Sequence, residues 1–328
     1  MNGQRVLVTG AGGFIGSHLC QALVERGAKV TAMCRYTSRR DEGNLVALPA
    51  AARAEIDVQF GDMRDRDFVG RLVGGAEAVF NLAASISVPY SFVAPREVVM
   101  TNVEGALNVL AAAAAGGGAR VLQMSSSEVY GTAQYTPIDE RHPLDAQSPY
   151  AASKVGADKL AESFHMAYGV PVVVARPFNT YGPRQSLRAV IPVVVAQALA
   201  GGELTLGSLT PTRDFVFVAD TVEGLIRLLA SDEATQGATF NIATGKDISV
   251  ADVVTVVGEL LGRELRVRSV GERLRPEKSE VHQLLGSPAK LRELTGWAPQ
   301  TDLRTGLAAV VEWMKTSGLA ARSAEYAV

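Results

Sequence analysis

The sequence predicts an α/β protein built on a doubly wound parallel sheet, with a smaller C-terminal α/β lobe. Three observations support this prediction. Short β-branched runs alternate with helical patterns in the first half of the chain, these runs are continuously apolar, and Gly and Pro become frequent after Phe178. Continuous apolar runs are typical of parallel strands that are buried on both faces. A length of 328 residues also favours two lobes over a single core.

The alternation predicts the elements in order. Strands are expected over residues 5–9, 29–34, 58–60, 78–82, 121–125 and 171–176. Helices are expected over residues 14–26, 98–115 and 149–168, and then over 187–200, 219–230, 249–261 and 303–315. Residues 215–218 and 240–242 are candidates to return to the sheet. The domains expected are therefore 1–178 with about 212–245 returning to it, and a smaller lobe of 179–211 and 246–328.

Composition excludes several classes of function. There are 32 Lys and Arg against 34 Asp and Glu, so the net charge of −2 provides no overall attraction to nucleic acid or anionic membrane. No uninterrupted apolar stretch reaches the roughly 18 residues of a membrane span. The N-terminus enters a strand at once, so we expect a cytoplasmic protein with no membrane or nucleic-acid partner. Cys20 and Cys34 resemble buried core residues of a reducing compartment, and the four histidines have no metal-ligand spacing, so no metal is expected.

A glycine-rich turn follows the first strand. Residues 9–16 read TGAGGFIG, with Gly10, Gly13 and Gly16 at the spacing of a dinucleotide-binding turn and Phe14 and Ile15 opening the helix. Gly10 permits the tight turn, Gly13 lets backbone N–H groups approach a pyrophosphate, and Gly16 allows close packing of helix on strand. The turn therefore predicts a Rossmann-type coenzyme site.

The end of the second strand leaves the choice between NAD and NADP open. An acidic residue that would hold the ribose hydroxyls is missing there, and the segment instead reads CRYTSRR, with Arg35 and Ser38 as candidates. A cation at this point favours the 2′-phosphate of NADP, although Arg39 and Arg40 also fit a solvated loop. Asp62, after the third strand, is a candidate for the adenine amino group, with a turn-forming Asp as the alternative.

A Tyr and a Lys occur four residues apart at the start of an expected helix. Ser148 and Pro149 suit the N-cap and first helical positions, so Tyr150 and Lys154 share one helix face. An ammonium about 4 Å from the phenol, together with the helix N-terminus, favours phenolate. Tyr150 is therefore predicted to take a hydroxyl proton while a hydride leaves the same carbon.

These motifs, with the NLAA segment at 81–84, Asn102 and the RPFNTYGPR segment at 176–184, resemble the extended short-chain dehydrogenase/reductase family. The resemblance covers Val6 to about Trp313. It implies a tightly held, recycled NADP or NAD in the N-terminal lobe, a nucleoside diphosphate sugar between the lobes, and a homodimer formed by the helices over 98–115 and 149–168. The implied coenzyme contacts also include Met63, Leu82, Ala83, Ala84, Asn102, Tyr150 and Lys154, and Ser126 is implied as the hydroxyl partner of Tyr150.

The stretch SSSEVYG at 125–131 distinguishes the possible reactions. In the family, 4,6-dehydratases place a Glu where Glu128 stands. Oxidation at C4 acidifies the C5 proton, a carboxylate removes it, the C6 hydroxyl leaves, and hydride returns to C6. Ser127 replaces the Asp that protonates the leaving hydroxyl in glucose-type dehydratases, so that acid is left open.

Three alternatives to dehydration remain. A 4-epimerase would use Tyr150, Lys154 and Ser126 with Glu128 as a structural carboxylate. A sugar-acid decarboxylase would need a cation for the C6 carboxylate, and none lies within residues 125–131. A protein that senses dinucleotides without turnover would keep the fold and lose the reaction.

Two further segments suggest the substrate. Residues 206–215 and 275–281 are similar to dehydratases that begin legionaminic acid pathways and act on nucleotide-linked N-acetylglucosamine. The resemblance implies the following substrate-binding residues: Ser85, Asn179, Arg184, Arg213, Arg275 and Glu277. The nucleotide base and the sugar remain open, and ordinary surface cations are the alternative for each Arg.

Overall fold

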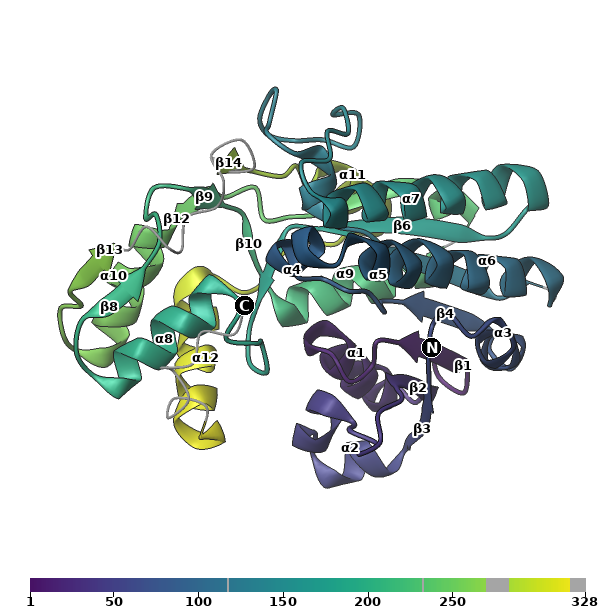
Figure 1. Ribbon diagram of the computed structural model, residues 1–328, viewed down its shortest axis with the longest axis horizontal. Coiled ribbons are helices and arrows are strands. Elements are labelled where there is room, and N and C mark those ends of the chain that lie inside the picture. The colour runs from purple at the N-terminus through teal and green to yellow at the C-terminus, as the bar shows by residue number, and fades with distance from the viewer. Residues whose placement is uncertain (117, 232, 270–282, 319–328) are drawn as a thin grey trace.

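The computed structural model describes the whole chain except residues 117, 232, 270–282 and 319–328 (Figure 1). A seven-stranded sheet has the order β11-β6-β5-β4-β1-β2-β3, and every neighbouring pair is parallel. Its strands are β1(Arg5–Thr9), β2(Lys29–Arg35), β3(Ile56–Gly61), β4(Ala78–Asn81), β5(Arg120–Met124), β6(Val172–Pro177) and β11(Thr239–Ile242). The predicted doubly wound, Rossmann-type sheet is confirmed.

Successive residues of the central strands pack into two different cores, which explains the consecutive apolar residues in each strand. In β1, Val6 and Val8 contribute to one core while Leu7 contributes to the other. The same alternation holds in β6, where Val172 and Val174 lie opposite Val173. Both faces of the sheet are therefore covered by helices.

Helices cover the sheet in two layers (Figure 1). One layer contains α1(Phe14–Glu25), α9(Val218–Ala230) and α11(Ala289–Thr295), and the other contains α3(Arg66–Gly74), α6(Gly105–Ala115) and α7(Pro149–Tyr168). Shorter helical segments are η1(Gly43–Ala47), α2(Ala50–Ala54), α4(Val88–Val93), α5(Pro95–Val99), η2(Met100–Glu104), η3(Ser127–Tyr130) and η4(Glu233–Thr235). Ser148 caps α7, as expected, by accepting the Ala151 N–H at 3.1 Å.

The helix expected over 98–115 is longer than predicted. It runs through α5, the π-helical turn η2 and α6, from Pro95 to Ala115. By length and composition, this is the one helix among the described residues that could cross a membrane, with a mean hydropathy of 1.4. It packs against α3 and α7 over the sheet, and we attribute its apolar composition to that packing.

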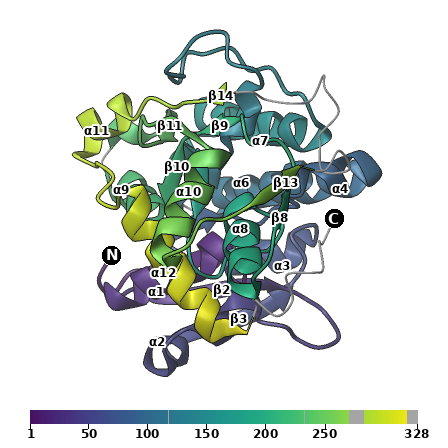
Figure 2. The same cartoon turned by 90° about the vertical axis from the view of Figure 1, so that its left-hand side faces the viewer.

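The smaller lobe, which faces the viewer in Figure 2, has its own hydrophobic core. Three helices surround this core, α8(Val190–Ala200), α10(Val250–Leu261) and α12(Leu303–Ser317). Its strands form small sheets: β8(Leu204–Leu206) pairs with β13(Val267–Ser269), and β9(Thr212–Arg213) lies between β12(Ile248–Ser249) and β14(Gln283–Leu284). The helices predicted at 249–261 and 303–315 are confirmed.

The division of the chain differs from the expectation in two places. Residues 215–217 form β10(Phe215–Phe217), which pairs with β7(Asn179–Tyr181) and not with the large sheet, because Phe215 packs in the core of the smaller lobe. Residues 240–242 do join the large sheet, in β11. Helix α11, which we assigned to the smaller lobe, packs on the larger one, since Leu291 and Trp297 are buried beside α9 and β11.

Asp214 fastens β9 and β10 to the neighbouring loops. Its carboxylate is fully buried and accepts hydrogen bonds from the Thr244 N–H and hydroxyl, at 2.8 and 2.7 Å, and from the Gly245 and Gly286 N–H groups. Burial raises the pKa of this carboxyl even though these donors oppose the shift. These hydrogen bonds therefore fix the backbone next to Arg213, the residue that precedes Asp214.

Candidate active site

The glycine turn has a backbone that larger residues would obstruct. Gly10 has a φ of +68°, and a Cβ at Gly10 would lie 2.9 Å from the backbone nitrogen of Ala83. A Cβ at Gly16 would overlap the Gly10 carbonyl. Gly13 is exposed and caps α1 without a side-chain hydrogen bond, so the first N–H groups of α1, at Phe14 and Ile15, are accessible to an anion.

Side-chain amides tie the carboxyl ends of three strands together behind this turn. The Thr9 hydroxyl donates to Asn81 Oδ1 at 2.8 Å, and Asn81 Nδ2 donates to Gln123 Oε1 at 2.8 Å. The Ala83 N–H in turn donates to Thr9 Oγ1 at 3.0 Å. The half-buried Leu82, Ala83 and Ala84 therefore lie at the switch point of the sheet, beside Gly10, where dinucleotides bind in this fold. Sequence reasoning missed Thr9 and Gln123, since a single polar residue at a strand end carries little signal.

The structure brings only some of the residues predicted to contact the adenosine close to one another. Arg35, the last residue of β2, and Ser38, which follows it, are both exposed, and Arg35 contributes to lowering the pKa of Asp62. Asp62 is bound by Arg64, which donates its backbone N–H at 3.0 Å and its guanidinium to the carboxylate. This contact holds the Asp62 pKa at about 2 and gives Asp62 the turn-forming role that was the alternative reading. The Met63 side chain is buried in the core, so only its backbone is available for contact.

The Asn102 side chain links the loop after β4 to α7 through three hydrogen bonds. It is buried, accepts the Ser85 N–H at 2.7 Å, and donates to the Ser85 carbonyl at 3.1 Å and to Ser153 Oγ at 2.8 Å. Ser153 lies on α7 between Tyr150 and Lys154. Asn102 therefore positions the loop after β4 against α7, and its assignment as a coenzyme contact stays a prediction. Ser85 itself donates to Glu97 at 3.1 Å.

Tyr150 and Lys154 lie on the buried face of α7, as the spacing predicts. The Ser126 side chain hydrogen-bonds Tyr150, and Glu128 lies close enough to influence its charge. Lys154 Nζ donates to the Met124 carbonyl at 2.9 Å, which leaves two further N–H donors on the ammonium. A phenol, a hydroxyl and an ammonium therefore converge at the end of β5.

The protonation of Tyr150 differs from the expectation. Burial is the dominant cause and raises the pKa of Tyr150 to about 12, while the Ser126 hydrogen bond opposes the shift. Burial also lowers the pKa of Lys154 to about 8. The sequence argument overestimated the effect of Lys154, because Lys154 is directed to the Met124 carbonyl and desolvation disfavours both charged forms.

The turn η3 carries the residues that discriminate between reactions. Ser126 Oγ accepts the Glu128 N–H at 3.2 Å, which places both side chains at the start of one short turn. Ser127 is buried, whereas Glu128 is half-buried. Glu128 therefore lies close enough to Tyr150 to raise the pKa of the phenol, and its side chain is only partly buried.

A cavity of about 360 Å³ is lined by residues from β7, the start of α8, β9 and the first residues of β10 and α10, on the side of the smaller lobe. Asn179 and Arg213, two of the predicted substrate residues, line it together with Gln185 and Arg188. The side-chain oxygens of Asn179 and Gln185 are buried and have no hydrogen-bond partner among the described residues. The two guanidinium groups suit an anionic group of a ligand, and the two unpartnered amide oxygens suit hydroxyl or N–H donors of the same ligand. Sequence reasoning missed Gln185 and Arg188, although both follow the RPFNTYGPR segment directly.

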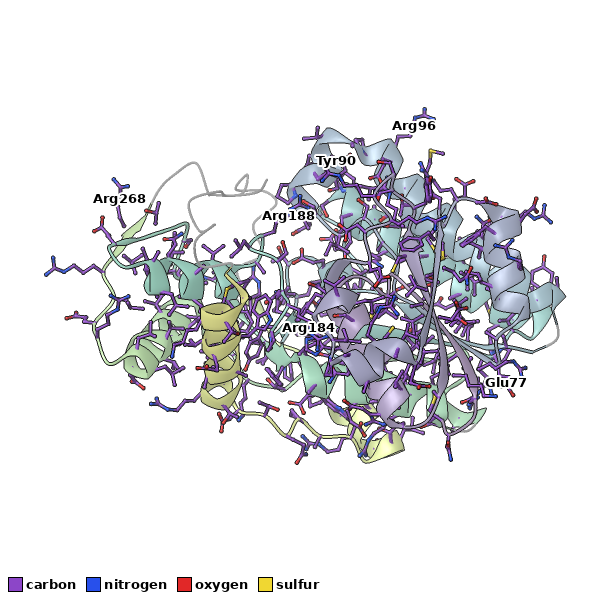
Figure 3. All side chains as sticks on the ribbon, turned by 90° about the horizontal axis from the view of Figure 1, so that it is seen from below. Glu77, Tyr90, Arg96, Arg184, Arg188 and Arg268 are labelled. Carbon is purple, nitrogen blue, oxygen red and sulfur yellow. The ribbon has the colours of Figure 1, made fainter. Side chains whose placement is uncertain are left out.

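Arg184 does not line this cavity. Its backbone has a φ of +68°, and its guanidinium points toward α1, where Nη2 bonds His18 Nδ1 and Gln21 Oε1, both at 2.9 Å. Burial lowers the pKa of His18 to about 4, so the ring is neutral and accepts from Arg184. Figure 3 shows Arg184 between the lobes, with Arg188 nearer the other edge of the junction. In this structure Arg184 therefore contacts α1, while its Nη1 is buried with no hydrogen-bond partner among the described residues, and its role as a substrate contact stays a prediction.

Arg275 and Glu277 lie outside the described residues. Within the part of the chain that the structure describes, no group of three or more His, Cys, Asp or Glu could hold a metal ion. Cys20 and Cys34 are buried free thiols.

The sheet is doubly wound and carries a dinucleotide turn, and the helix α7 that follows β5 and Ser126 carries a Tyr and a Lys four residues apart. These features define the class of extended short-chain dehydrogenases/reductases. Residues 7–310 match the family described as GDP-mannose 4,6 dehydratase. The chain therefore belongs to this family of nucleotide-sugar dehydratases and epimerases.

Known relatives with different activities are equally similar. A dTDP-glucose 4,6-dehydratase of Xanthomonas campestris is 33% identical, over 95% of this chain and 93% of the relative. A UDP-glucose 4-epimerase of Mycolicibacterium smegmatis is also 33% identical, over 95% and 98%. The solved dTDP-glucose 4,6-dehydratase of Streptomyces venezuelae, with NAD bound, has a TM-score of 0.86 at 31% identity and covers 96% of this chain and 98% of that one. Identity alone therefore does not separate the reactions.

Proposed function

We propose that this protein is a nucleotide-sugar 4,6-dehydratase, which converts a nucleoside diphosphate hexose into its 4-keto-6-deoxy form. The observation that carries the proposal is the position of Glu128, which shares the turn η3 with Ser126 and lies beside Tyr150. A carboxylate next to the oxidising base is required for dehydration and is not required for epimerisation at C4.

The residues present fit a dinucleotide coenzyme. Gly10, Gly13 and Gly16 leave room for a pyrophosphate where any Cβ would obstruct the turn, and the α1 N-terminus favours the anion. Leu82, Ala83 and Ala84 would line the coenzyme, and Lys154 retains donors for its ribose. NAD(P), when bound, accepts a hydride from C4 and returns it to C6.

Tyr150 takes the C4 hydroxyl proton in this proposal. The Ser126 hydroxyl bonds the same oxygen and orients it, and Lys154 supplies positive charge from the same helix face. Since burial raises the pKa of Tyr150 to about 12 even with Lys154 on the same helix face, the positive charge that the oxidised coenzyme would bring to the site is needed as well to obtain the base form at neutral pH.

Glu128 removes the C5 proton, which the C4 ketone has acidified. The C6 hydroxyl then leaves as water, and its proton comes from Glu128 through the buried Ser127 hydroxyl. When hydride returns to C6, a proton is added at C5, which balances the proton that Tyr150 took from the C4 hydroxyl. Asn179, Gln185, Arg188 and Arg213 would hold the diphosphate and nucleotide in the cavity of about 360 Å³.

A panel of sugar nucleotides with UDP, dTDP, GDP and CDP tests the proposal. Products are weighed by mass spectrometry, and a 4,6-dehydratase subtracts one water. A product of unchanged mass but altered C4 stereochemistry, which NMR identifies, would establish the 4-epimerase instead. Loss of carbon dioxide from a glucuronate nucleotide would establish the decarboxylase. A protein that retains coenzyme and changes none of the panel would be the non-enzymatic sensor.

Nucleotide-linked N-acetylglucosamine is the substrate we propose first. The support is the resemblance of residues 206–215 to dehydratases of legionaminic acid pathways. A solved UDP-N-acetylglucosamine 4-epimerase of Methanobrevibacter ruminantium also has this fold, with a TM-score of 0.87 at 28% identity. In the panel, this substrate should be converted with the highest kcat/KM.

For the coenzyme we propose NADP over NAD, because Arg35 is exposed at the end of β2 where a carboxylate would otherwise hold the ribose. Arg35→Ala should weaken NADPH binding about 10–100-fold while changing NADH binding little, since one charge-assisted contact to the 2′-phosphate is lost. Fluorescence titration with each reduced coenzyme measures this. Arg120→Ala, at the amino end of the inner strand β5, is the control, and equal losses for both coenzymes would contradict the assignment.

We also propose that the protein is a cytoplasmic homodimer. Large apolar side chains are exposed along consecutive elements on one side of the molecule: Tyr90, Phe92, Val93, Val99, Met100 and Leu107. A second copy would cover them through α6 and α7. Light scattering should give a dimer for the wild type and a monomer for Leu107→Glu. Leu294→Glu, on α11, should remain dimeric, and a monomeric wild type would refute the assembly.

A further inference from the structure

The helix face that carries Tyr150 and Lys154 continues to Asp158. The three residues are four apart, so they lie in one row along α7. The Asp158 side chain is completely buried, and its Oδ2 accepts from Ser125 Oγ at 2.9 Å and from Arg176 Nε and Nη2 at 3.1 and 2.9 Å. Its Oδ1 is buried with no hydrogen-bond partner within the described chain. The reaction proposed above does not use this carboxylate.

Arg176, on β6, donates hydrogen bonds to two different partners, Asp158 and Tyr130. Besides Asp158, it donates from Nη1 to the Tyr130 hydroxyl at 3.1 Å, and its guanidinium lies 5.0 Å from the centre of the Tyr130 ring. The Tyr130 hydroxyl donates to Asn241 Oδ1 on β11 at 2.7 Å. Tyr130 is the last residue of η3, the turn that carries Glu128. One buried guanidinium therefore connects the helix of Tyr150 and Lys154 to the turn of Glu128.

Stability is a poor reason for burying this pair. Desolvating a carboxylate and a guanidinium offsets most of their attraction, and well-packed apolar residues often stabilise such a site as much or more. The unpartnered Oδ1 adds to the cost. The position of the pair, between the two parts of the active site, points to function.

We propose that Asp158 and Arg176 are positioning residues, which hold the Tyr150–Lys154 helix and the Glu128 turn in register and place a negative charge behind Lys154. This rests on the proposed function, because the roles of Tyr150 and Glu128 are assigned there. Asp158 acts through Lys154 and Tyr150, and Arg176 acts through Asp158 and Tyr130.

The charge of Asp158 has a defined direction of effect. Asp158 on α7 and Glu128 on η3 are the carboxylates that face Tyr150, and Asp158 also faces Lys154. From the other elements, Arg176 faces Asp158, and Glu140 faces Tyr130. Asp158 raises the pKa of both Lys154 and Tyr150, so removing its charge lowers both pKa values.

Asp158→Asn tests the electrostatic part in the holoenzyme. Coenzyme reduction is followed in a single turnover against pH, with a sugar nucleotide that the wild type oxidises. The rate rises with pH as Tyr150 loses its proton and falls as Lys154 loses its own. Both limbs of this pH profile should move to lower pH by about one unit, since deprotonation of each group becomes easier. An unchanged profile would overturn the proposal. Dehydratases and epimerases both begin with C4 oxidation, so this result does not depend on which reaction follows.

A measurement without turnover separates this proposal from the function. An NMR pH titration of isotope-labelled lysine, with the Lys154 signal assigned through Lys154→Met, should show a lower Lys154 pKa in Asp158→Asn. A wild type that oxidises no sugar nucleotide would count against the proposed function, while the titration would still decide the role of Asp158. If Asp158→Asn fails to fold because Arg176 is left uncompensated, the double variant Asp158→Asn/Arg176→Met removes both charges and should shift Lys154 the same way.

Tyr130→Phe tests the second arm. Losing the hydroxyl that Arg176 and Asn241 hold should slow deoxy-product formation about tenfold and slow coenzyme reduction less, because the Glu128 turn is loosened while α7 is not. Equal rates in wild type and variant would overturn this arm.

Asp220→Asn is the matched control for the pH profile of Asp158→Asn. This buried carboxylate accepts the Gln300 and Thr301 N–H groups away from the site, so its loss should reduce stability without moving either limb of the profile.

Discussion

Replacing Glu128 with glutamine is expected to stop the reaction after its first half. Tyr150, Lys154 and Ser126 remain, so the sugar is still oxidised at C4 and the coenzyme is reduced. The amide is not basic enough to remove the C5 proton, so water is not lost and hydride is not returned to C6. Deoxy-product formation should fall about 10²–10⁴-fold, as is usual for loss of a general base.

The signature of Glu128→Gln is reduced coenzyme that accumulates on the enzyme. Its near-ultraviolet absorbance and fluorescence should rise on mixing with the sugar nucleotide and then persist, whereas the wild type returns to the oxidised form. Glu162→Gln, a partly exposed carboxylate on α7 that pairs with Lys159, serves as the control and should behave like the wild type. Undiminished deoxy-product from Glu128→Gln would refute the dehydratase and favour the 4-epimerase, in which this carboxylate is structural.

Replacing Tyr150 with phenylalanine should abolish the first half of the reaction, the oxidation at C4, which Glu128→Gln leaves intact. The phenol oxygen is the acceptor for the C4 hydroxyl proton, and the buried site leaves little water to substitute for it. Coenzyme reduction should therefore fall about 10²–10⁴-fold. Binding of coenzyme should change little, since the glycine turn and Lys154 are untouched.

Single-turnover absorbance measures the loss in Tyr150→Phe, and fluorescence titration checks that coenzyme is still held. Tyr168→Phe, at the exposed end of the same helix, is the matched control and should keep the wild-type rate. Coenzyme reduction at the wild-type rate in Tyr150→Phe would show that another group takes the proton. The two variants together separate oxidation from elimination, because only Glu128→Gln traps reduced coenzyme.

Much of the larger lobe was predictable from local patterns. Strand runs such as VLVT at 6–9 are apolar because helices bury both faces, and the glycines at 10, 13 and 16 identify the turn that follows. Tyr150 and Lys154 share a face because helical spacing is fixed. Each of these features depends on residues close together in the chain, which is why a single sequence reveals them.

Features that depend on distant residues were not predictable in the same way. Asp158 and Arg176 meet only because β6 lies beside β5 under α7, and Tyr130 reaches Asn241 across 111 positions of sequence. Arg184 occurs in a segment that resembles a substrate-binding motif, yet its positive φ and the packing of its loop turn it toward α1.

The sequence by itself determined the sheet, the coenzyme turn and the row of Tyr150 and Lys154, because short-range periodicity and glycine conformation specify them. Only the tertiary structure decided which strands joined the sheet, where Arg184 points and how far burial shifts the pKa of Tyr150. The physical reason is that desolvation and long-range hydrogen bonds depend on what packs around a residue, and that surrounding exists only once the chain has folded.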